Sequence, residues 1–314
     1  MKIMFMGTPE ISAECLRVLV ERGHTVTSVV TGEDKPRGRG NIMTPTATKR
    51  VAEDLGIRVY TPKTLRGEEF AEILREESPE LIAVVAYGKI LPESVIDFPK
   101  YGCVNLHVSL LPKYRGAAPM QRAVMEGESE TGVTVMYMDV GLDTGDIIAQ
   151  RSFPISREDD FEAVHDRSLE IGSVLLSDTI YDIEAGRATR TPQDSSLATY
   201  AKKVEREDAE IDFGLEAATV SARIRGVTPI PGAFTYKDGR LLKLSGVVET
   251  EGCGMPGEVI CLDPVGSGSF TVACGSGAIL VRFVTPEGKG RMSAGDYIRG
   301  RKISLGDILG KKES

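Results

Sequence analysis

The sequence contains no long hydrophobic run. No apolar stretch approaches the ~20 residues that a transmembrane helix needs, and the longest ones have the length of a strand. Residues 1–7 reach a turn too early for a signal peptide and predict a first buried strand instead. We therefore expect a protein that does not associate with membranes.

Cysteine is scarce, and its spacing does not suit a metal site. The five cysteines include no C-x-x-C pair, so we expect no bound metal. An odd number of thiols without a secretion signal favours reduced cysteines and a cytoplasmic location. Cys103 stands close to the candidate catalytic residues below and could be mistaken for a nucleophile. Because Gly102 and Val104 continue a buried strand, we predict that it packs in the core.

Two common nucleotide-binding loops are also missing. The turn after the first strand, Gly7-Thr8-Pro9, departs from G-x-G-x-x-G, and Pro9 lacks the N–H that a pyrophosphate would use. The run Arg37-Gly38-Arg39-Gly40 lacks the Lys-Ser/Thr ending of a Walker loop. We therefore expect no dinucleotide cofactor.

Positive charge is not in excess, since the net charge is −8, which disfavours a generally basic nucleic-acid binder. The basic residues nevertheless gather in two segments. Residues 282–312 hold eight basic and three acidic residues, and residues 33–50 hold five and two. Two solvated faces are one interpretation; two patches that bind a selected polyanion are the other.

Short apolar runs alternate with amphipathic segments in the first part of the chain. This alternation predicts an α/β domain with a Rossmann-like, mostly parallel sheet and helices on both faces. The expected strands are residues 2–6, 25–31, 81–85, 102–107 and 133–138, and the expected helices are 11–22, 46–55, 68–77 and 120–126.

The pattern changes after a long helix expected at residues 160–185. We predict a first domain of residues 1–189, a polar linker at 190–206 and a smaller second domain at 207–314. A helix at 215–225 and short β runs separated by glycine and proline turns predict a closed or nearly closed β-barrel there.

Three polar residues follow strands of the expected sheet. Asn105 and His107 end one strand, and Asp143 follows another through a glycine-rich loop. Because chemistry gathers at the carboxyl ends of parallel strands, we expect all three in one crevice. They suit attack of an amine on a one-carbon carbonyl: an amide stabilises the oxyanion, an imidazole moves a proton, and a carboxylate orients the imidazole and accepts the amine proton. The alternative is structural: the Asn-x-His side chains satisfy loop backbone, and Asp143 is a turn residue.

The motifs around these residues resemble the folate-dependent formyltransferases. That family carries Asn-x-His, Ser-Leu-Leu-Pro, Arg-Gly-Ala-Ala-Pro and a Gly-Leu-Asp-Thr-Gly-Asp run. The matches are Asn105, His107, Ser109–Pro112, Arg115–Pro119 and Gly141–Asp146. Further matches, at Gly7–Pro9, Val85–Pro92, Thr199–Lys203, Arg225, Pro229–Ala233 and Met292–Asp296, extend the resemblance over nearly the whole chain.

The resemblance implies the reaction and its donor. The equivalents of Asn105, His107 and Asp143 are catalytic in the family, and the donor is 10-formyltetrahydrofolate, a cosubstrate released as tetrahydrofolate. No tightly bound cofactor is implied. The residues implied in folate binding are Ser109, Leu110, Leu111, Pro112, Tyr87, Gly88, Ile90, Leu91 and Asp139.

The remainder of the chain resembles the branch of the family that formylates the α-amino group of methionyl initiator tRNA for translation initiation. This implies an inserted loop, Gly32–Thr44, that enters the acceptor end of the tRNA, with Arg39 as its main basic residue. It also implies an OB-like second domain that grips tRNA. The residues implied in tRNA binding are Lys35, Arg37, Arg39, Arg299, Arg301 and Lys302. We expect a monomer.

The sequence differs from the family pattern at two positions, and three alternative functions remain. Val108 stands where many members have a smaller residue, and Ile230 replaces a common tryptophan, which removes an aromatic surface. Enzymes acting on amino sugars or glycinamide ribonucleotide, and formyltetrahydrofolate hydrolases, share the catalytic motif. A non-catalytic RNA-binding protein is the third rival, but the retained polar trio disfavours it.

Overall fold

The computed structural model describes residues 1–37 and 40–310, without the side chain of Arg37. It divides into two compact units. The N-terminal unit comprises residues 1–116, 132–152 and 166–200, and the C-terminal unit comprises residues 117–131, 153–165 and the chain from Ala201 on. This division differs from the predicted boundaries at 189 and 207. Two segments of the expected first domain belong to the C-terminal unit, and residues 190–200 of the expected linker belong to the N-terminal unit.

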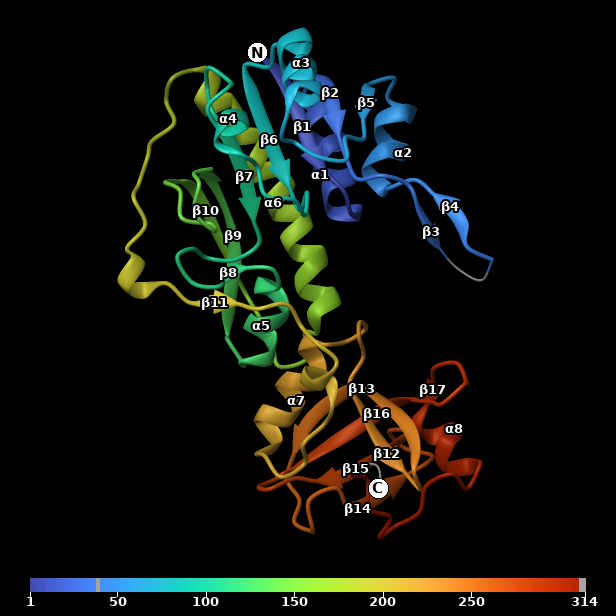
Figure 1. The fold of residues 1–314 in the computed structure, drawn as a ribbon. Helices are drawn as coiled ribbons and strands as arrows, with labels where there is room; N and C mark the ends of the chain where they lie inside the picture. Colours follow the sequence, from blue (N-terminus) through green and yellow to red (C-terminus); the bar gives the residue numbers. More distant parts are fainter. Residues whose placement is uncertain (38–39, 311–314) are drawn as a thin grey trace. The chain divides into compact units, whose positions relative to one another are not determined.

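A seven-stranded sheet forms the N-terminal unit, in the order β10-β9-β7-β6-β1-β2-β5 (Figure 1). Neighbours from β7 to β5 pair in parallel, whereas β7 and β9 are antiparallel. The predicted mostly parallel sheet is therefore confirmed. Its strands are β1 (Lys2–Gly7), β2 (Thr25–Val30), β5 (Arg58–Tyr60), β6 (Leu81–Val85), β7 (Cys103–His107), β9 (Glu130–Tyr137) and β10 (Ile147–Pro154).

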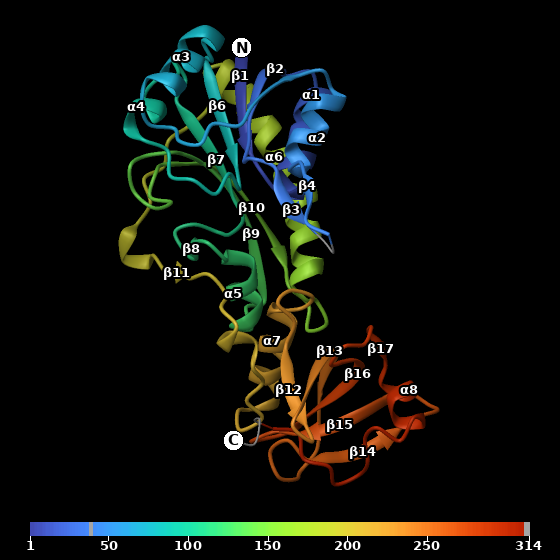
Figure 2. The same cartoon turned by 45° about the vertical axis from the view of Figure 1, so that its right-hand side comes forward.

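Successive side chains of a strand point to opposite faces of the sheet. Because the strands are apolar at successive positions, both faces are apolar and helices cover both. In β1, Ile3 and Phe5 join one core cluster, and Met4 and Met6 join another. Figure 2 shows α3 and α4 on one side and α1, α2 and α6 on the other. The helices are α1 (Glu10–Glu21), α2 (Ala47–Asp54), α3 (Glu68–Glu77), α4 (Glu93–Ile96) and α6 (Phe161–Glu184).

Short elements connect these layers. A hairpin of β3 (Lys35–Arg37) and β4 (Ile42–Thr44) interrupts the chain between β2 and α2. Farther along, β8 (Arg115–Gly116) pairs with β11 (Tyr200–Ala201), and the 3-10 helix η1 (Ser195–Leu197) lies just before β11. No helix of the described residues is both long and apolar enough to cross a bilayer.

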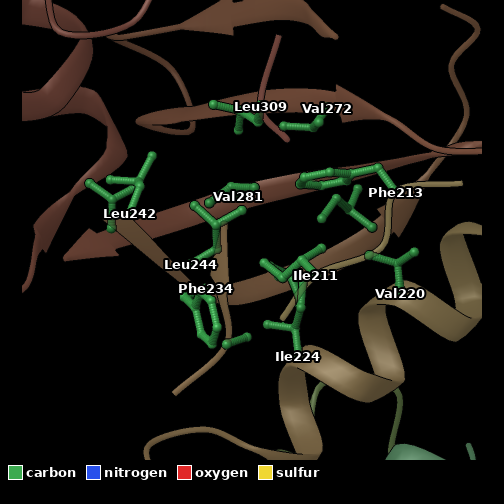
Figure 3. Close-up of a cluster of buried hydrophobic side chains, with 14 of the residues drawn as sticks. Ile211, Phe213, Val220, Ile224, Phe234, Leu242, Leu244, Val272, Val281 and Leu309 are labelled. Carbon is green, nitrogen blue, oxygen red and sulfur yellow. The ribbon is translucent and has the colours of Figure 1, made fainter. Parts of the chain in front are cut away.

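The C-terminal unit is an antiparallel sheet in the order β12-β13-β16-β15-β14, with β17 on β16. Its strands are β12 (Phe234–Lys237), β13 (Arg240–Thr250), β14 (Val259–Asp263), β15 (Ser269–Ala273), β16 (Ala278–Pro286) and β17 (Met292–Ser293). Its helices are α5 (Pro119–Met125), η2 (Glu207–Ala209), α7 (Ala217–Gly226) and α8 (Ala294–Arg299). Figure 3 shows Val220 and Ile224 of α7 in the same apolar cluster as Ile211, Phe213 and Leu244.

The last described residues bring the two edges of this sheet together. Ile308 bridges Glu258 beside β14, and Gly310 bridges Tyr236 of β12. Gly257 must be glycine for this, because a Cβ there would lie 2.0 Å from the carbonyl oxygen of Leu309. The segment thus covers strand edges that would otherwise expose unpaired backbone groups. The result is the nearly closed barrel that the turn spacing predicts.

Candidate active site

The strand β7 places two of the predicted catalytic side chains on one face of the sheet. Asn105 and His107 are two residues apart, a rise of roughly 6.6 Å along a strand, so they point the same way. Leu106 between them joins the core cluster on the opposite face. Asn105 is partly exposed, whereas His107 is buried.

The imidazole of His107 is fixed at one nitrogen. Nε2 lies 2.9 Å from the carbonyl oxygen of Tyr114. A carbonyl oxygen only accepts, so Nε2 carries a proton and donates it in this bond. Nδ1 faces Asp143 at 3.8 Å from Oδ2. Nδ1 is therefore the ring atom that remains available to take up or release a proton.

The carboxylate of Asp143 is held by the strand next to it. The N–H of Gly116 in β8 donates to Oδ2 at 2.8 Å. Asp143 has a φ of +53°, a backbone conformation that is uncommon outside glycine and that Asp tolerates better than most residues. The loop that carries it, residues 139–146, is held together by Asp139, whose Oδ1 accepts from the N–H of Gly141 and from Oγ1 of Thr144. His107 and Asp143 thus come together as predicted. The expected reason was wrong, because β9, the strand before Asp143, runs antiparallel to β7, and the loop 139–146 brings the carboxylate back to the histidine.

The predicted folate segment 109–112 is fixed mainly through its backbone. Oγ1 of Thr134 donates to the carbonyl oxygen of Ser109 at 2.7 Å, and the amide of Gln150 donates to that of Leu111 at 2.9 Å. The side chains of Ser109 and Leu111 are themselves buried, whereas Leu110 and Pro112 are partly exposed. The segment is therefore held in place by its backbone, and Leu110 and Pro112 are the side chains of it that a ligand could contact.

The second predicted folate segment, which follows β6, contains two kinds of residue. Tyr87 and Leu91 pack in the core cluster with α3 and α4. Burial raises the pKa of the Tyr87 phenol to about 12, and its hydroxyl has no hydrogen-bond partner among the described residues. Gly88 and Ile90 are exposed, Ile90 by 89%. Ile90 is thus a side chain that a ligand could cover, with Tyr87 and Leu91 supporting the segment from behind.

Two apolar residues of the segment 139–143, which the resemblance implies in pterin binding, are exposed in the loop before Asp143. Val140 is 75% exposed and Leu142 is 60% exposed. Exposed apolar side chains beside polar catalytic groups are typical of a ligand-binding surface.

The predicted basic loop is the β3–β4 hairpin with its tip. Lys35 is exposed in β3, the backbone of Arg37 ends β3, and Arg39 lies outside the described residues. Two other cations of this basic segment have acidic partners: Lys49 contacts Asp34 at 2.9 Å, and Arg50 contacts Glu10 at 3.1 Å. Among the described cations of this segment, Lys35 is therefore the better candidate for an anionic ligand.

The predicted tRNA residues of the C-terminal unit differ in availability. The guanidinium of Arg299 donates to Asp296 and to the carbonyl oxygen of Pro264. Arg301 and Lys302 are exposed. In the same unit, the Arg291 guanidinium lies over the Phe283 ring at 3.9 Å. Among the described residues, no group of three or more His, Cys, Asp or Glu side chains is arranged to hold a metal ion.

Cys103 is expected to resist alkylation in the native protein. Its Sγ lies 3.5 Å from the carbonyl oxygen of Val95, and burial, with Asp97 nearby, raises the pKa of its thiol. Cys253 and Cys261 are exposed. Brief iodoacetamide treatment at about pH 8, followed by peptide mass spectrometry, should find those two modified and Cys103 intact. Labelling in denaturant is the control, and native labelling of Cys103 would contradict its packing role.

Comparisons with known proteins place this chain in a family. Residues 1–180 match the family described as Formyl transferase, and residues 203–302 match its C-terminal domain. The chain is 45% identical over 314 residues to the methionyl-tRNA formyltransferase of Citrifermentans bemidjiense, covering 100% of this chain and 98% of the relative. The corresponding enzyme of Geobacter sulfurreducens is 42% identical, with 100% and 98% covered.

Solved structures share the fold at lower identity. The sugar 3N-formyltransferase WlaRD, crystallised with dTDP and 5-N-formyl-THF, matches with a TM-score of 0.66 at 19% identity, over 92% of this chain and 99% of that one. HypX from Aquifex aeolicus, in complex with tetrahydrofolic acid, matches with a TM-score of 0.64 at 20% identity, over 94% of this chain and 46% of that one. The full-length relatives and the matched family models establish that the chain belongs to the methionyl-tRNA formyltransferase family.

Proposed function

We propose that this chain transfers the formyl group of 10-formyltetrahydrofolate to the α-amino group of methionyl initiator tRNA, with Asn105, His107 and Asp143 as its catalytic residues. The observation that carries the proposal is the orientation of His107. Its Nε2 is occupied by the Tyr114 carbonyl, while Nδ1 faces the Asp143 carboxylate. An imidazole held in this way can act as a proton donor and acceptor at one defined atom.

The proposed reaction proceeds through a tetrahedral intermediate. The neutral amine of the methionyl ester attacks the formyl carbon, a new C–N bond forms, and the carbonyl oxygen becomes an oxyanion. Asn105 donates its amide N–H to that oxygen, and protonated Nδ1 of His107 adds positive charge next to it. A preorganised amide donor is typically worth ~3 kcal/mol of barrier.

Proton transfers complete the reaction. Asp143 accepts, through a water, the proton that the attacking amine loses. Nδ1 of His107 gives a proton to the folate N10 as the bond from N10 to carbon breaks, and the proton held by Asp143 then restores the imidazole. The products are formylmethionyl-tRNA and tetrahydrofolate, so no oxidant or other reactant is needed. Acid–base assistance of this kind contributes roughly 10²- to 10⁴-fold.

The acceptor identifies the reaction. The decisive assay measures formyl transfer to charged initiator tRNA, charged elongator tRNA, free methionine and an amino sugar, each with 10-formyltetrahydrofolate. We expect turnover on charged initiator tRNA far above the other three. Turnover on the amino sugar without tRNA would replace this proposal with that of a sugar formyltransferase, and hydrolysis of the donor with no formylated acceptor would replace it with a hydrolase.

Removal of the basic side chain of Arg39, between β3 and β4 in the sequence, should weaken tRNA use alone. Arg39→Ala is expected to raise the KM for charged tRNA about tenfold and to leave the KM for the folate donor unchanged, because one phosphate contact supplies ~1–2 kcal/mol at low salt. The slope of log kcat/KM against log salt concentration should fall in magnitude by about one.

Arg17→Ala is the matched control for this variant. Arg17 is an exposed arginine on α1 that contacts Glu14 at 3.0 Å, so its loss removes a positive charge of the same kind elsewhere on the N-terminal unit. We expect its tRNA kinetics to equal those of the wild type. Identical tRNA kinetics for Arg39→Ala would withdraw the role of the hairpin.

A further inference from the structure

The segment 190–200, which resembles a linker in composition, is built into the N-terminal unit. Thr191 exchanges backbone hydrogen bonds with Ile147 of β10. Thr199 holds the residues around β8: its Oγ1 accepts from the N–H of Tyr114 at 2.8 Å, and its carbonyl oxygen accepts from the N–H of Arg115 at 2.8 Å. Between these two anchors lies Gln193.

Besides a long contact of its Nε2 with the sulfur of Met136 at 3.9 Å, the side chain of Gln193 makes four hydrogen bonds to two parts of the site. Its amide Nε2 donates to the carbonyl oxygens of Asp143 at 2.9 Å and Gly145 at 2.8 Å. Its Oε1 accepts from Nε and one terminal nitrogen of Arg115, at 3.1 and 2.7 Å. The partners fix the orientation of the amide, because carbonyl oxygens only accept and a guanidinium only donates.

Arg115 stands between the two residues that hold the catalytic pair. The carbonyl of Tyr114 before it binds His107, and the N–H of Gly116 after it binds Asp143. Arg115 itself is only 2% exposed. Gln193 therefore connects the backbone that fixes both catalytic side chains to the loop from which Asp143 projects.

We propose that Gln193 is a positioning residue for Asp143. Its hydrogen bonds to the carbonyl oxygens of Asp143 and Gly145 hold the loop in one backbone conformation. In that conformation, Oδ2 of Asp143 lies between the Gly116 N–H and Nδ1 of His107. Glutamine suits this place because it alone among neutral side chains of this length donates at one end and accepts at the other. The proposal rests on the proposed function, in which Asp143 accepts the amine proton.

The test distinguishes the donor end of the Gln193 amide from its acceptor end. Gln193→Glu keeps an acceptor for the buried Arg115 but loses both donors, so the protein should fold while the loop is released. We expect kcat to fall about 10- to 100-fold, since small displacements of a catalytic group have effects of this size, with the KM for 10-formyltetrahydrofolate within about twofold. Gln193→Met loses both ends and should lower kcat by at least as much, together with the Tm.

Two further variants exclude a purely structural role. Asp194→Ala is the control in the same segment, because Asp194 only caps η1 through Ser196 and touches neither Arg115 nor Asp143. It should match the wild type in kcat. In an Asp143→Ala background, Gln193→Glu should lower single-turnover rates by less than about twofold, since a residue that acts through Asp143 has no further effect once Asp143 is absent.

Each outcome decides between the claims. Wild-type kcat in Gln193→Glu, or losses that multiply in the double variant, would overturn the positioning role. If Asp143→Ala itself turned over at the wild-type rate, the catalytic assignment under the proposed function would fall instead. An inactive Asp143→Ala beside a fully active Gln193→Glu would remove this inference and leave the proposed function intact.

Discussion

Asp143→Asn should lower kcat for formyl transfer by about 10³-fold while the KM for 10-formyltetrahydrofolate stays within about twofold. The substitution is nearly isosteric, and its Oδ1 can still accept from the N–H of Gly116, which lies 2.8 Å from the native carboxylate. What is lost is the negative charge next to Nδ1 of His107 and the capacity to accept a proton. Losses of acid–base assistance are typically 10²- to 10⁴-fold. Steady-state kinetics with varied donor separate the effect on kcat from that on KM.

Asp146→Asn is the matched control for this substitution. Asp146 belongs to the same loop, and its Oδ2 lies 4.0 Å from Arg190. It should keep kcat within about threefold. If Asp143→Asn retained a kcat comparable to that of Asp146→Asn, the carboxylate would be a turn residue and not a proton acceptor, which is the structural alternative that the sequence left open.

The placement of Asn105 and His107 could be predicted because it follows a short-range rule. Asn105 and His107 are two residues apart, and any strand places such a pair on one face. Asp143 was expected beside them for two reasons, the shared carboxyl edge of parallel strands and the family motif. The first reason was wrong, because β9, the strand before Asp143, runs antiparallel to β7, and the loop after β9 returns the carboxylate to His107.

Gln193 and Arg115 escaped prediction for the opposite reason. Gln193 acts on the carbonyl oxygens of Asp143 and Gly145, about 50 residues earlier, and backbone acceptors leave no pattern in a sequence. Its neighbours are polar and irregular, as in a true linker. Arg115 appeared only within a family motif; nothing local indicates that its guanidinium is buried.

The boundaries of the two compact units also could not be predicted from local sequence patterns. The helix α5 was expected in the first domain, yet it packs on α7: a Cβ on Gly226 would lie 2.3 Å from Cγ of Met125. Likewise, Arg225 donates to the carbonyl oxygen of Asp159 at 2.6 Å. These contacts join segments separated by 66 to about 100 residues, and periodicity within a segment carries no information about its distant partner.

Gly145→Ala is the second substitution expected to have a large effect, and it tests whether the loop of Asp143 must stay where it is. An added Cβ would lie 1.9 Å from the carbonyl oxygen of Tyr137, which is backbone of β9 and cannot turn aside. The loop must therefore move away from β9. That movement strains the hydrogen bonds from Gln193 to Gly145 and from the N–H of Tyr137 to Asp146.

We expect Gly145→Ala to lower kcat about 10²-fold, because a shift of the order of 1 Å in a catalytic group has that consequence, and to destabilise the protein by about 1–3 kcal/mol, as is typical of overpacking. Thermal unfolding and steady-state kinetics on folded protein measure the two effects separately. Gly290→Ala is the control for stability, since its Cβ would meet nothing within 4 Å. Full activity in a destabilised Gly145→Ala variant would mean that the Asp143 carboxylate reaches its position even when the loop has moved. The rate would then depend on the presence of the Asn105, His107 and Asp143 side chains more than on the backbone that holds them.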